Sequence, residues 1–315
     1  MIYNPVAGRY PSRLLAERAC EVLNREGWDI SIEQSQGGAH ITALAKKAGQ
    51  EGLDALFVIG GDGSLNHAVA GLVNTQTALG ILPAGTANVW AQELGLSTLG
   101  WTRWMALEKS AISLANGVSI RIDIGLCNNK PFLLWSGVGL DGYIVHKIEP
   151  RSRWEKSMAI FHYGASAIWY ASKWPGITMD VQVDGKKIKG HYLLLLASNI
   201  QLYAGGLIHL SPENRLDDGT MDLWLLEGEH MGDTIRSAWE LFTGRFAGNS
   251  QVSRIPFKSL CIQSSTPMYI QLDGEPLPAE NKVEIQVLPR SLQVLVPKVT
   301  PYPISQEFTF DNQDK

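Results

Sequence analysis

A glycine-rich turn between an apolar strand and a helix is the feature that most constrains how this chain can fold. The apolar run 55–59 predicts a buried strand, and it ends abruptly in Gly60-Gly61-Asp62-Gly63. A helical pattern then begins at Ser64, with apolar residues on one face. Backbone N–H groups in such a turn approach an anion closely, and the helix N-terminus adds the positive end of its dipole. The turn therefore predicts a phosphate-binding loop around one carboxylate, although a tight turn without a ligand would also need these glycines.

Two further turns have the same setting. Residues 2–8 predict the end of a strand broken by Asn4-Pro5, and residues 79–88 predict a strand that enters a Pro/Gly turn. After that turn, Thr86 or Asn88 is expected to cap a helix. Helical patterns over 12–25 and 41–49 alternate with the predicted strands. Because loops that follow parallel strands meet at one edge of a sheet, we expect a doubly wound α/β nucleotide-binding domain over residues 1–120.

The second half of the chain has the pattern of a β-rich domain. From about residue 119, period-two alternation replaces helical periodicity, and Asp184-Gly185 predicts a hairpin turn. We expect a β-sandwich-like domain over 121–296, with separate strands at 282–288 and 292–296, and a helix at 98–116 that bridges the two domains. Asp141-Gly142 is expected to be a plain turn.

Two helical patterns interrupt these strands. Residues 151–173 place basic residues at both ends of an aromatic stretch. That pattern suits the surface of an anionic membrane, or an ordinary amphipathic helix that covers the sandwich. Residues 233–246 suit either core packing or part of a lipid pocket.

Composition excludes some classes of protein. The net charge of −4 argues against a general nucleic-acid binder, which would carry a basic surplus. The three cysteines, Cys20, Cys127 and Cys261, lack the spacing of a zinc site and predict reduced thiols in a cytoplasm. No signal peptide or bilayer-crossing apolar run is visible. The first strand is short before Tyr3, so we expect a truncated or misassigned start.

Four ordered motifs resemble the diacylglycerol kinase catalytic-domain family, which includes bacterial diacylglycerol kinases, YegS-like lipid kinases and sphingosine kinases. They are Asn4-Pro5 with Gly8, and the segments 60–64, 82–88 and 272–275. The resemblance covers nearly the whole chain. It implies ATP in a cleft between an α/β domain and a β-rich domain, with the tail 297–315 packed back on the first domain. Ser64 stands where threonine is usual, and Arg9-Tyr10 replace a glycine.

The resemblance also implies roles for individual residues. The nucleotide-binding residues it implies are Asn4, Pro5, Gly8, Gly60, Gly61, Asp62, Gly63, Ser64, Gly85, Thr86 and Asn88. Asp273 becomes the general base and Glu275 lies beside the metal or nucleotide, although Asp273-Gly274 alone would predict only a hairpin turn. Asp62 either organises Mg²⁺ near the phosphates or fixes its loop.

A structural Mg²⁺ loop is implied at residues 215–221. Asp218 would supply a carboxylate, and Arg215 and Thr220 would supply backbone carbonyl oxygens, which are ligands that hard cations prefer. The alternative is a simple turn that leads into the strand beginning at Met221.

The function implied by the resemblance is an ATP-dependent lipid kinase that phosphorylates a primary hydroxyl of diacylglycerol, a sphingoid base or a related lipid. One alternative is an NAD kinase-like small-molecule kinase, which shares the Gly-Gly-Asp-Gly loop but has an Asn-Glu pair that this chain lacks. Another is a non-catalytic nucleotide or lipid sensor, against which Asp62, Asp273 and Glu275 argue. The expected partners are the lipid, an anionic surface at the inner membrane face and a second copy of the chain.

Overall fold

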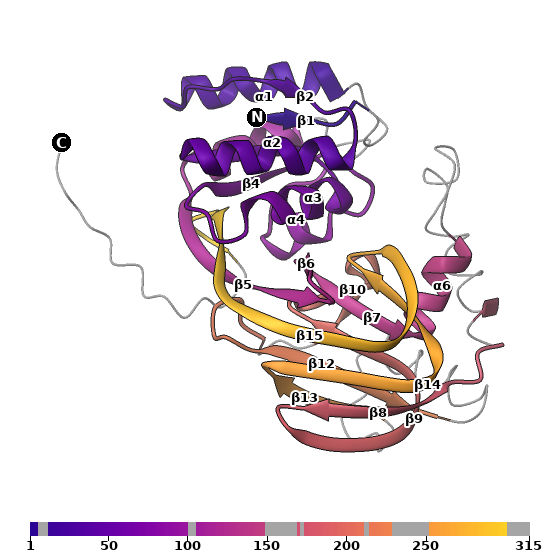
Figure 1. Cartoon of the computed structure of the whole chain (residues 1–315). Helices are drawn as coiled ribbons and strands as arrows, with labels where there is room; N and C mark the ends of the chain where they lie inside the picture. Colours follow the sequence, from indigo (N-terminus) through magenta and orange to yellow (C-terminus); the bar gives the residue numbers. More distant parts are fainter. Residues whose placement is uncertain are drawn as a thin grey trace.

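The computed structural model describes residues 1–5, 12–99, 105–148, 169–170, 173–210, 214–228 and 252–300. Strands and helices alternate in the first part of the chain, and strands dominate the second (Figure 1). The first part contains β1 (Ile2–Tyr3), α1 (Ser12–Arg25), β2 (Glu33–Gln34), α2 (Gly38–Glu51), β3 (Ala55–Gly60), α3 (Asp62–Leu72), β4 (Ala78–Pro83), α4 (Val89–Glu93) and α5 (Ala106–Ala115). The second contains β5 (Val118–Cys127), β6 (Lys130–Phe132), β7 (Trp135–Gly139), α6 (Leu140–Ile148), β8 (Ile177–Val183), β9 (Lys186–Ser198), β10 (Leu202–Tyr203), η1 (Ala204–Gly206), β11 (Ile208–His209), β12 (Met221–Glu227), β13 (Val252–Phe257), β14 (Ser259–Leu272) and β15 (Glu275–Val296).

The first domain is a parallel sheet between two pairs of helices. Its strand order is β4-β3-β1-β2, and β3 pairs with β4 from Ala55 opposite Ala78 to Gly60 opposite Pro83. Helix α1 packs with α5, and α2 packs with α3. Because helices cover both faces of this parallel sheet, β3 and β4 are apolar along almost their whole length. The predicted doubly wound α/β fold is confirmed.

The second domain is antiparallel and has its own core. Its strands follow the order β13-β12-β9-β7-β14-β15, with β8 paired to β9 and β14. The alternating apolar residues of β8 and β14 face a cluster that includes Phe132, Tyr192 and Phe257. The predicted hairpin at Asp184-Gly185 is confirmed, with left-handed φ values of 46° and 84°. This agrees with the expected β-sandwich-like domain.

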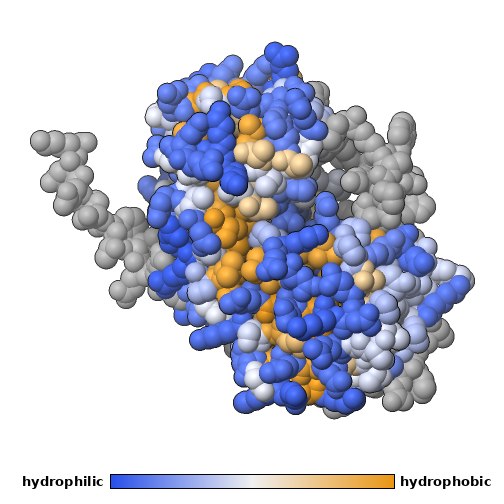
Figure 2. All heavy atoms as spheres, viewed as in Figure 1, coloured by the Kyte–Doolittle hydropathy of each residue, from blue (hydrophilic) through white to orange (hydrophobic). Residues whose placement is uncertain are grey.

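Two strands run through both domains and join them. Strand β15 pairs with β14 and β5, and its Val294 also pairs in parallel with Leu79 of β4, so that thirteen of the strands in the described part of the chain form one sheet. The prediction of two separate strands at 282–288 and 292–296 was wrong. The strand continues through Pro289-Arg290 because the register shifts there and Arg290 takes a φ of 46°. Figure 2 shows a broken band of hydrophobic residues across the middle of this face, in the region of β5 and β15.

Some predictions about helices and turns need correction, and others lie outside the described residues. Helix α3 begins at Asp62 rather than Ser64, and α5 is shorter than the predicted 98–116. Asp141-Gly142 is not a plain turn but the first turn of α6, because Gly142 lets the helix lie directly on the backbone of Tyr269. Almost all of 151–173, all of 233–246 and the tail beyond residue 300 lie outside the described residues.

Candidate active site

Two glycine loops meet where the neighbouring strands β3 and β4 end. The N–H groups of Ala84 and Gly85 donate to the carbonyl oxygen of Gly60, at 2.9 and 3.2 Å. A Cβ atom added at Gly85 would lie 2.5 Å from the Cα of Gly61. The loops therefore pack backbone against backbone, a contact that only glycine allows.

The carboxylate of Asp62 joins these loops. Its Oδ2 accepts a hydrogen bond from the N–H of Val89 at 3.0 Å, and its Oδ1 accepts one from the N–H of Trp90 at 3.2 Å. These are orphan donors at the N-terminus of α4, so Asp62 caps a helix that begins 27 residues later in the chain. Burial raises the pKa of Asp62, against the opposing effect of these N–H groups. The contacts match one of its two predicted roles, that of fixing the loop, and the Mg²⁺ role stays a prediction.

The predicted cap of α4 by Thr86 or Asn88 was wrong. Asn88 occupies the N-cap position with a left-handed φ of 52° and makes no capping bond. Its side chain is used within its own loop, where Oδ1 accepts from the N–H of Gly85 and Nδ2 donates to the carbonyl oxygen of Gly85, each at 2.9 Å. Thr86 is exposed on the same loop.

The loop after β1 adjoins the start of α3. The Nδ2 of Asn4 donates to the Oγ of Ser64 at 3.2 Å, and Ser64 is buried. Pro5 follows on this loop, and Gly8 lies outside the described residues. The side chain of Ser64 thus connects the first predicted motif to the second.

Asp273 is held in the tight turn between β14 and β15. It has a φ of 49°, and the following Gly274 has a φ of 86°. Its carboxylate accepts hydrogen bonds from the N–H groups of Leu133, Leu134 and Trp135, at 2.8, 2.8 and 3.0 Å. Burial and, to a smaller extent, the charge of Asp62 together raise the pKa of Asp273 to about 7 in spite of these three donors. Asp273 therefore lies in the hairpin turn that Asp-Gly predicts, and it is also a buried carboxylate with a raised pKa.

Residues of the second domain face the glycine loops of the first. The Oε1 of Glu275 lies 3.3 Å from the position that a Cβ at Gly63 would occupy. The charge of Asp62 acts on the pKa of Asp273. The structure therefore brings the acidic residues of the last motif together with the Gly-Gly-Asp-Gly loop, as expected for a site between the two domains.

The loop at 215–220 is organised by a carboxylate that the sequence analysis missed. Asp123 lies in β5 and is fully buried, and it accepts hydrogen bonds from the N–H groups of Gly219 and Arg290 at 2.6 and 2.7 Å. Burial raises the pKa of Asp123, and the charges of Asp218 and Asp217 raise it further. The sequence does contain a signal for this residue, because Asp123 is the one acidic residue in the mostly apolar strand β5 and a buried acid needs partners.

The predicted metal loop has a defined turn. The Oδ1 of Asp218 accepts from both the N–H and the hydroxyl of Thr220, each at 2.9 Å, and Arg215 is exposed. Within the described residues, no group of three or more His, Cys, Asp or Glu side chains is arranged to hold a metal. The predicted ligands are one carboxylate and two backbone carbonyls, a set that differs from such a cluster of side chains. The metal site therefore stays a prediction. The negative charge gathered around Asp123 suits a cation.

A second missed carboxylate ties the two domains together. Glu93 ends α4, and its carboxylate accepts hydrogen bonds from the N–H groups of Gln201 and Leu202 at 2.9 and 3.0 Å. Burial raises the pKa of Glu93 to about 7. The sequence around Glu93 gives no sign of this role, because the residues that it binds lie more than a hundred positions away in the chain.

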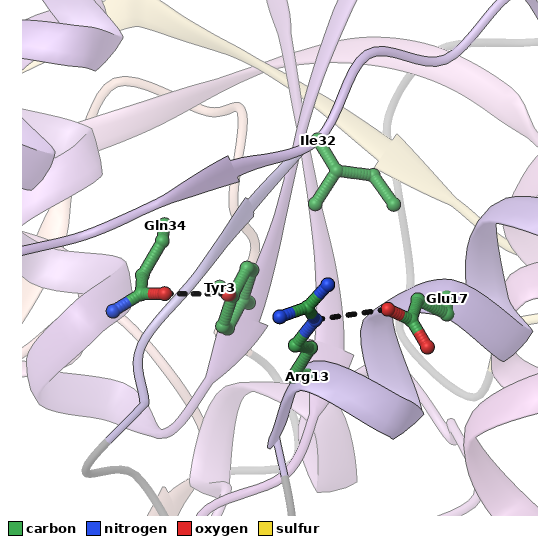
Figure 3. Close-up of a pocket in the computed structure, with 5 residues that line it drawn as sticks. All are labelled: Tyr3, Arg13, Glu17, Ile32 and Gln34. Atoms are coloured by element: carbon green, nitrogen blue, oxygen red, sulfur yellow. Dashed lines mark hydrogen bonds and ion pairs between the residues drawn. The ribbon is translucent and has the colours of Figure 1, made fainter.

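A hollow of about 250 Å³ lies beside the end of β1. It is lined by Tyr3, Arg13, Glu17, Ile32 and Gln34, where the Tyr3 hydroxyl donates to Gln34 and Arg13 pairs with Glu17 (Figure 3). None of these lining residues belongs to the glycine loops. The hollow borders the first motif, because Tyr3 directly precedes Asn4 in the chain.

Comparisons with known proteins cover nearly the whole chain. Residues 1–127 match the model of the diacylglycerol kinase catalytic domain, and residues 137–296 match that of the YegS C-terminal NAD kinase beta sandwich-like domain. A diacylglycerol kinase of Bacillus subtilis is 26% identical over 303 residues, covering 95% of this chain and 96% of that protein. A diacylglycerol kinase of Mycobacterium tuberculosis is 28% identical over 304 residues, covering 94% of each.

Solved structures share the fold. A putative diacylglycerol kinase from Bacillus anthracis superimposes with a TM-score of 0.76 at 19% identity, covering 94% of this chain and 95% of that one. An NAD kinase from Archaeoglobus fulgidus, solved in complex with ATP, gives a TM-score of 0.52 at 12% identity and covers 94% of this chain and 93% of that one. At these identities the likeness concerns the fold alone.

Proposed function

This chain belongs to the diacylglycerol kinase family, in the form that carries a YegS-type C-terminal domain, and from that premise we propose that it transfers the γ-phosphate of ATP to a primary hydroxyl of diacylglycerol or a related lipid. As a member of a kinase family it is a phosphotransferase. The observation that carries the finer proposal is the position of Asp273 and Glu275 against the glycine loops. The names of the bacterial relatives support a lipid acceptor, and the NAD kinase complex supports ATP as donor.

The glycine loops bind the phosphates of the nucleotide in this proposal. Gly61 and Gly85 pack backbone against backbone, with the Oδ1 of Asn88 as the nearest side-chain atom, so a phosphate can approach the two loops closely. Helix α3 begins at Asp62 and directs the positive end of its dipole toward an anion there. Asn4 and Ser64 hold the neighbouring loop, and Thr86 offers a hydroxyl from the exposed turn.

Asp273 acts as the general base. It takes the proton of the acceptor hydroxyl while the hydroxyl oxygen forms a bond to the γ-phosphorus. The bond from that phosphorus to the bridging oxygen breaks, and ADP leaves with the electron pair. A carboxylate with a pKa of about 7 suits this work at neutral pH, and its three N–H donors fix its orientation.

Magnesium fits the charge of this site. Glu275, together with phosphate oxygens, would hold it, and it would offset the charge of the phosphates. A second Mg²⁺ in the loop of Arg215, Asp218 and Thr220 would have a structural role. The buried carboxylate of Asp123 beneath that loop supports the assignment.

A surface beside the site suits contact with an anionic membrane. Trp169 is 59% exposed, and the Lys173 ammonium lies 4.1 Å from its ring centroid. Lys147 of α6 lies 5.5 Å from the ring centroid of Tyr143. Aromatic rings with adjacent cations are typical of proteins that bind at the lipid–water interface. Among the residues the structure describes, no helix has both the length and the apolarity to cross a bilayer. A cytoplasmic location and a homodimer stay predictions.

Radiolabelled ATP tests the proposal against its alternatives. Purified protein is incubated with [γ-³²P]ATP and Mg²⁺ and with vesicles of diacylglycerol, with sphingosine or with NAD, and the products are separated by chromatography. We expect a labelled lipid with the wild type and none with Asp273→Asn. Asp184→Asn is the matched control, because Asp184 lies in a turn of the same geometry far from the glycine loops in the sheet. Label on NAD would favour the small-molecule kinase, and ATP binding without label on any acceptor would favour a sensor.

A further inference from the structure

A buried polar pair lies beside the candidate base and has no role in the chemistry described above. Asp141, in the first turn of α6, is 9% exposed, and Gln271, in β14, is fully buried. The Nε2 of Gln271 donates to the Oδ2 of Asp141, and its Oε1 accepts from the N–H of Gly274 at 2.8 Å. Two hydrogen bonds in sequence therefore connect α6 to the turn that holds Asp273.

The two partners fix the orientation of the Gln271 side chain. A backbone N–H only donates, so the oxygen of the Gln271 amide must face Gly274. The NH₂ group must then face Asp141, which accepts. Asp141 also accepts from Tyr203, whose ring packs edge-on against Trp135 with centroids 5.4 Å apart. The pair is thus supported from a second side.

Glycine at two positions is required by this arrangement. Gly137 of β7 lies directly opposite Gln271 in the sheet, and a Cβ at Gly137 would overlap the Oδ2 of Asp141. A Cβ at Gly142 would overlap the backbone of Tyr269 in β14. The glycines of segment 137–142 therefore allow the Asp141 carboxylate to lie against the sheet next to Asp273. Each of these glycines loses more conformational entropy on folding than another residue would.

A second turn in the same chain shows that the pair is not needed to form the turn itself. Gln182-Val183-Asp184-Gly185 repeats the pattern of residues 271–274, and its φ values of 46° and 84° match the 49° and 86° of Asp273 and Gly274. Gln182 is exposed. The turn at Asp273 differs from it in being buried and in being attached to α6 through Gln271.

We propose that Asp141 and Gln271 are positioning residues, which hold the Asp273-Gly274 turn against α6 so that the Asp273 carboxylate stays aligned with the acceptor hydroxyl. The inference rests on the proposed function, because it takes Asp273 as the base. It adds two residues that need not touch either substrate.

Steady-state kinetics of four variants test this role. Gln271→Met keeps the length of the side chain but removes both hydrogen bonds, and misalignment of a reacting group lowers kcat by roughly 10- to 100-fold. The KM for ATP should stay within about twofold, because the glycine loops are unchanged. Asp141→Leu should act like Gln271→Met, whereas Asp141→Asn keeps an oxygen for the Gln271 NH₂ group and should restore most of kcat. Gln182→Met is the matched control and should behave as the wild type.

Hydrogen exchange at the Gly274 amide gives a readout that does not need activity. Its protection should fall in Gln271→Met and stay unchanged in Gln182→Met. Wild-type protection and wild-type kcat in Gln271→Met would overturn the proposal, as would a loss in Asp141→Asn equal to that in Asp141→Leu. If the wild type phosphorylates no lipid, the proposed function fails, and the exchange comparison still decides whether Gln271 holds the turn.

Discussion

Replacing Gly85 with alanine tests whether close backbone contact between two loops builds the phosphate site. The added Cβ would lie 2.5 Å from the Cα of Gly61, which is 0.9 Å short of the 3.4 Å at which ordinary contact begins. The atom it meets is backbone and cannot rotate away, so the loops must separate. Overpacking of this kind costs about 1–3 kcal/mol of unfolding free energy. If the separation also removes one hydrogen bond to a charged phosphate, worth about 1.5–3 kcal/mol, ATP binds roughly 10- to 150-fold more weakly.

Urea unfolding followed by circular dichroism measures the first effect, and titration calorimetry with ATP measures the second. Gly63→Ala is the matched control from the same motif. Its Cβ would meet only the Oε1 of Glu275, at 3.3 Å, and that flexible side chain can move aside. The position lies in α3, where alanine is favoured over glycine by up to about 1 kcal/mol. Wild-type stability and ATP affinity in Gly85→Ala would refute the reasoning, and so would an equal loss of unfolding free energy in Gly63→Ala, which is a control for stability only.

Other groups give outcomes that can be checked in the same assays. The pKa values of Asp273 and Glu93 are raised to about 7, so the folded state holds their protons more tightly than the unfolded chain does. The free energy of unfolding should therefore fall as pH rises from about 4 to 7, and Glu93→Gln should reduce that slope in urea titrations at several pH values; an unchanged slope contradicts the assignment. Because only ionised Asp273 accepts a proton, kcat/KM should rise with pH through about 7, and a flat profile would exclude it as the base. Asp62→Ala leaves two N–H groups of α4 unpaired and should cost about 2–4 kcal/mol in urea unfolding, whereas a loss below 1 kcal/mol would show that the cap is dispensable. Asp218→Ala, or removal of Mg²⁺ by EDTA, should lower Tm, and no change in either experiment would remove the metal-loop assignment.

Sequence patterns were most informative where local signals and burial agree. The apolar run before Gly60 became β3, because a parallel strand covered on both faces needs apolar residues at every position. The boundaries of α1 match the predicted 12–25, and β12 begins at Met221, as predicted. The change of periodicity near residue 119 coincides with the start of β5 at Val118.

The rest depended on contacts between residues far apart in the chain. Three of the five Asp-Gly pairs in the chain show how the same local signal can have different settings. Asp184 lies in an exposed hairpin, Asp273 in a buried one, and Asp141 in the first turn of a helix. Similarly, Asp123 and Glu93 bind backbone groups between 96 and 167 residues away, so no short window of sequence contains both partners. Turn propensity fixes local geometry, whereas the tertiary fold decides which carboxylates are buried.

The paired strands β5 and β15 have a mechanical consequence. From Ile285 opposite Cys127 to Val296 opposite Val118, the two strands form an antiparallel ribbon with one interruption, between Leu288 and Leu292. Swivelling one half of the molecule on the other would shear this ribbon and break its ladder of hydrogen bonds, except at that interruption, where Asp123 already holds the N–H of Arg290. The pairing of β5 with β15 therefore resists a rigid-body rotation between the two halves, and any such rotation would be concentrated at residues 288–292.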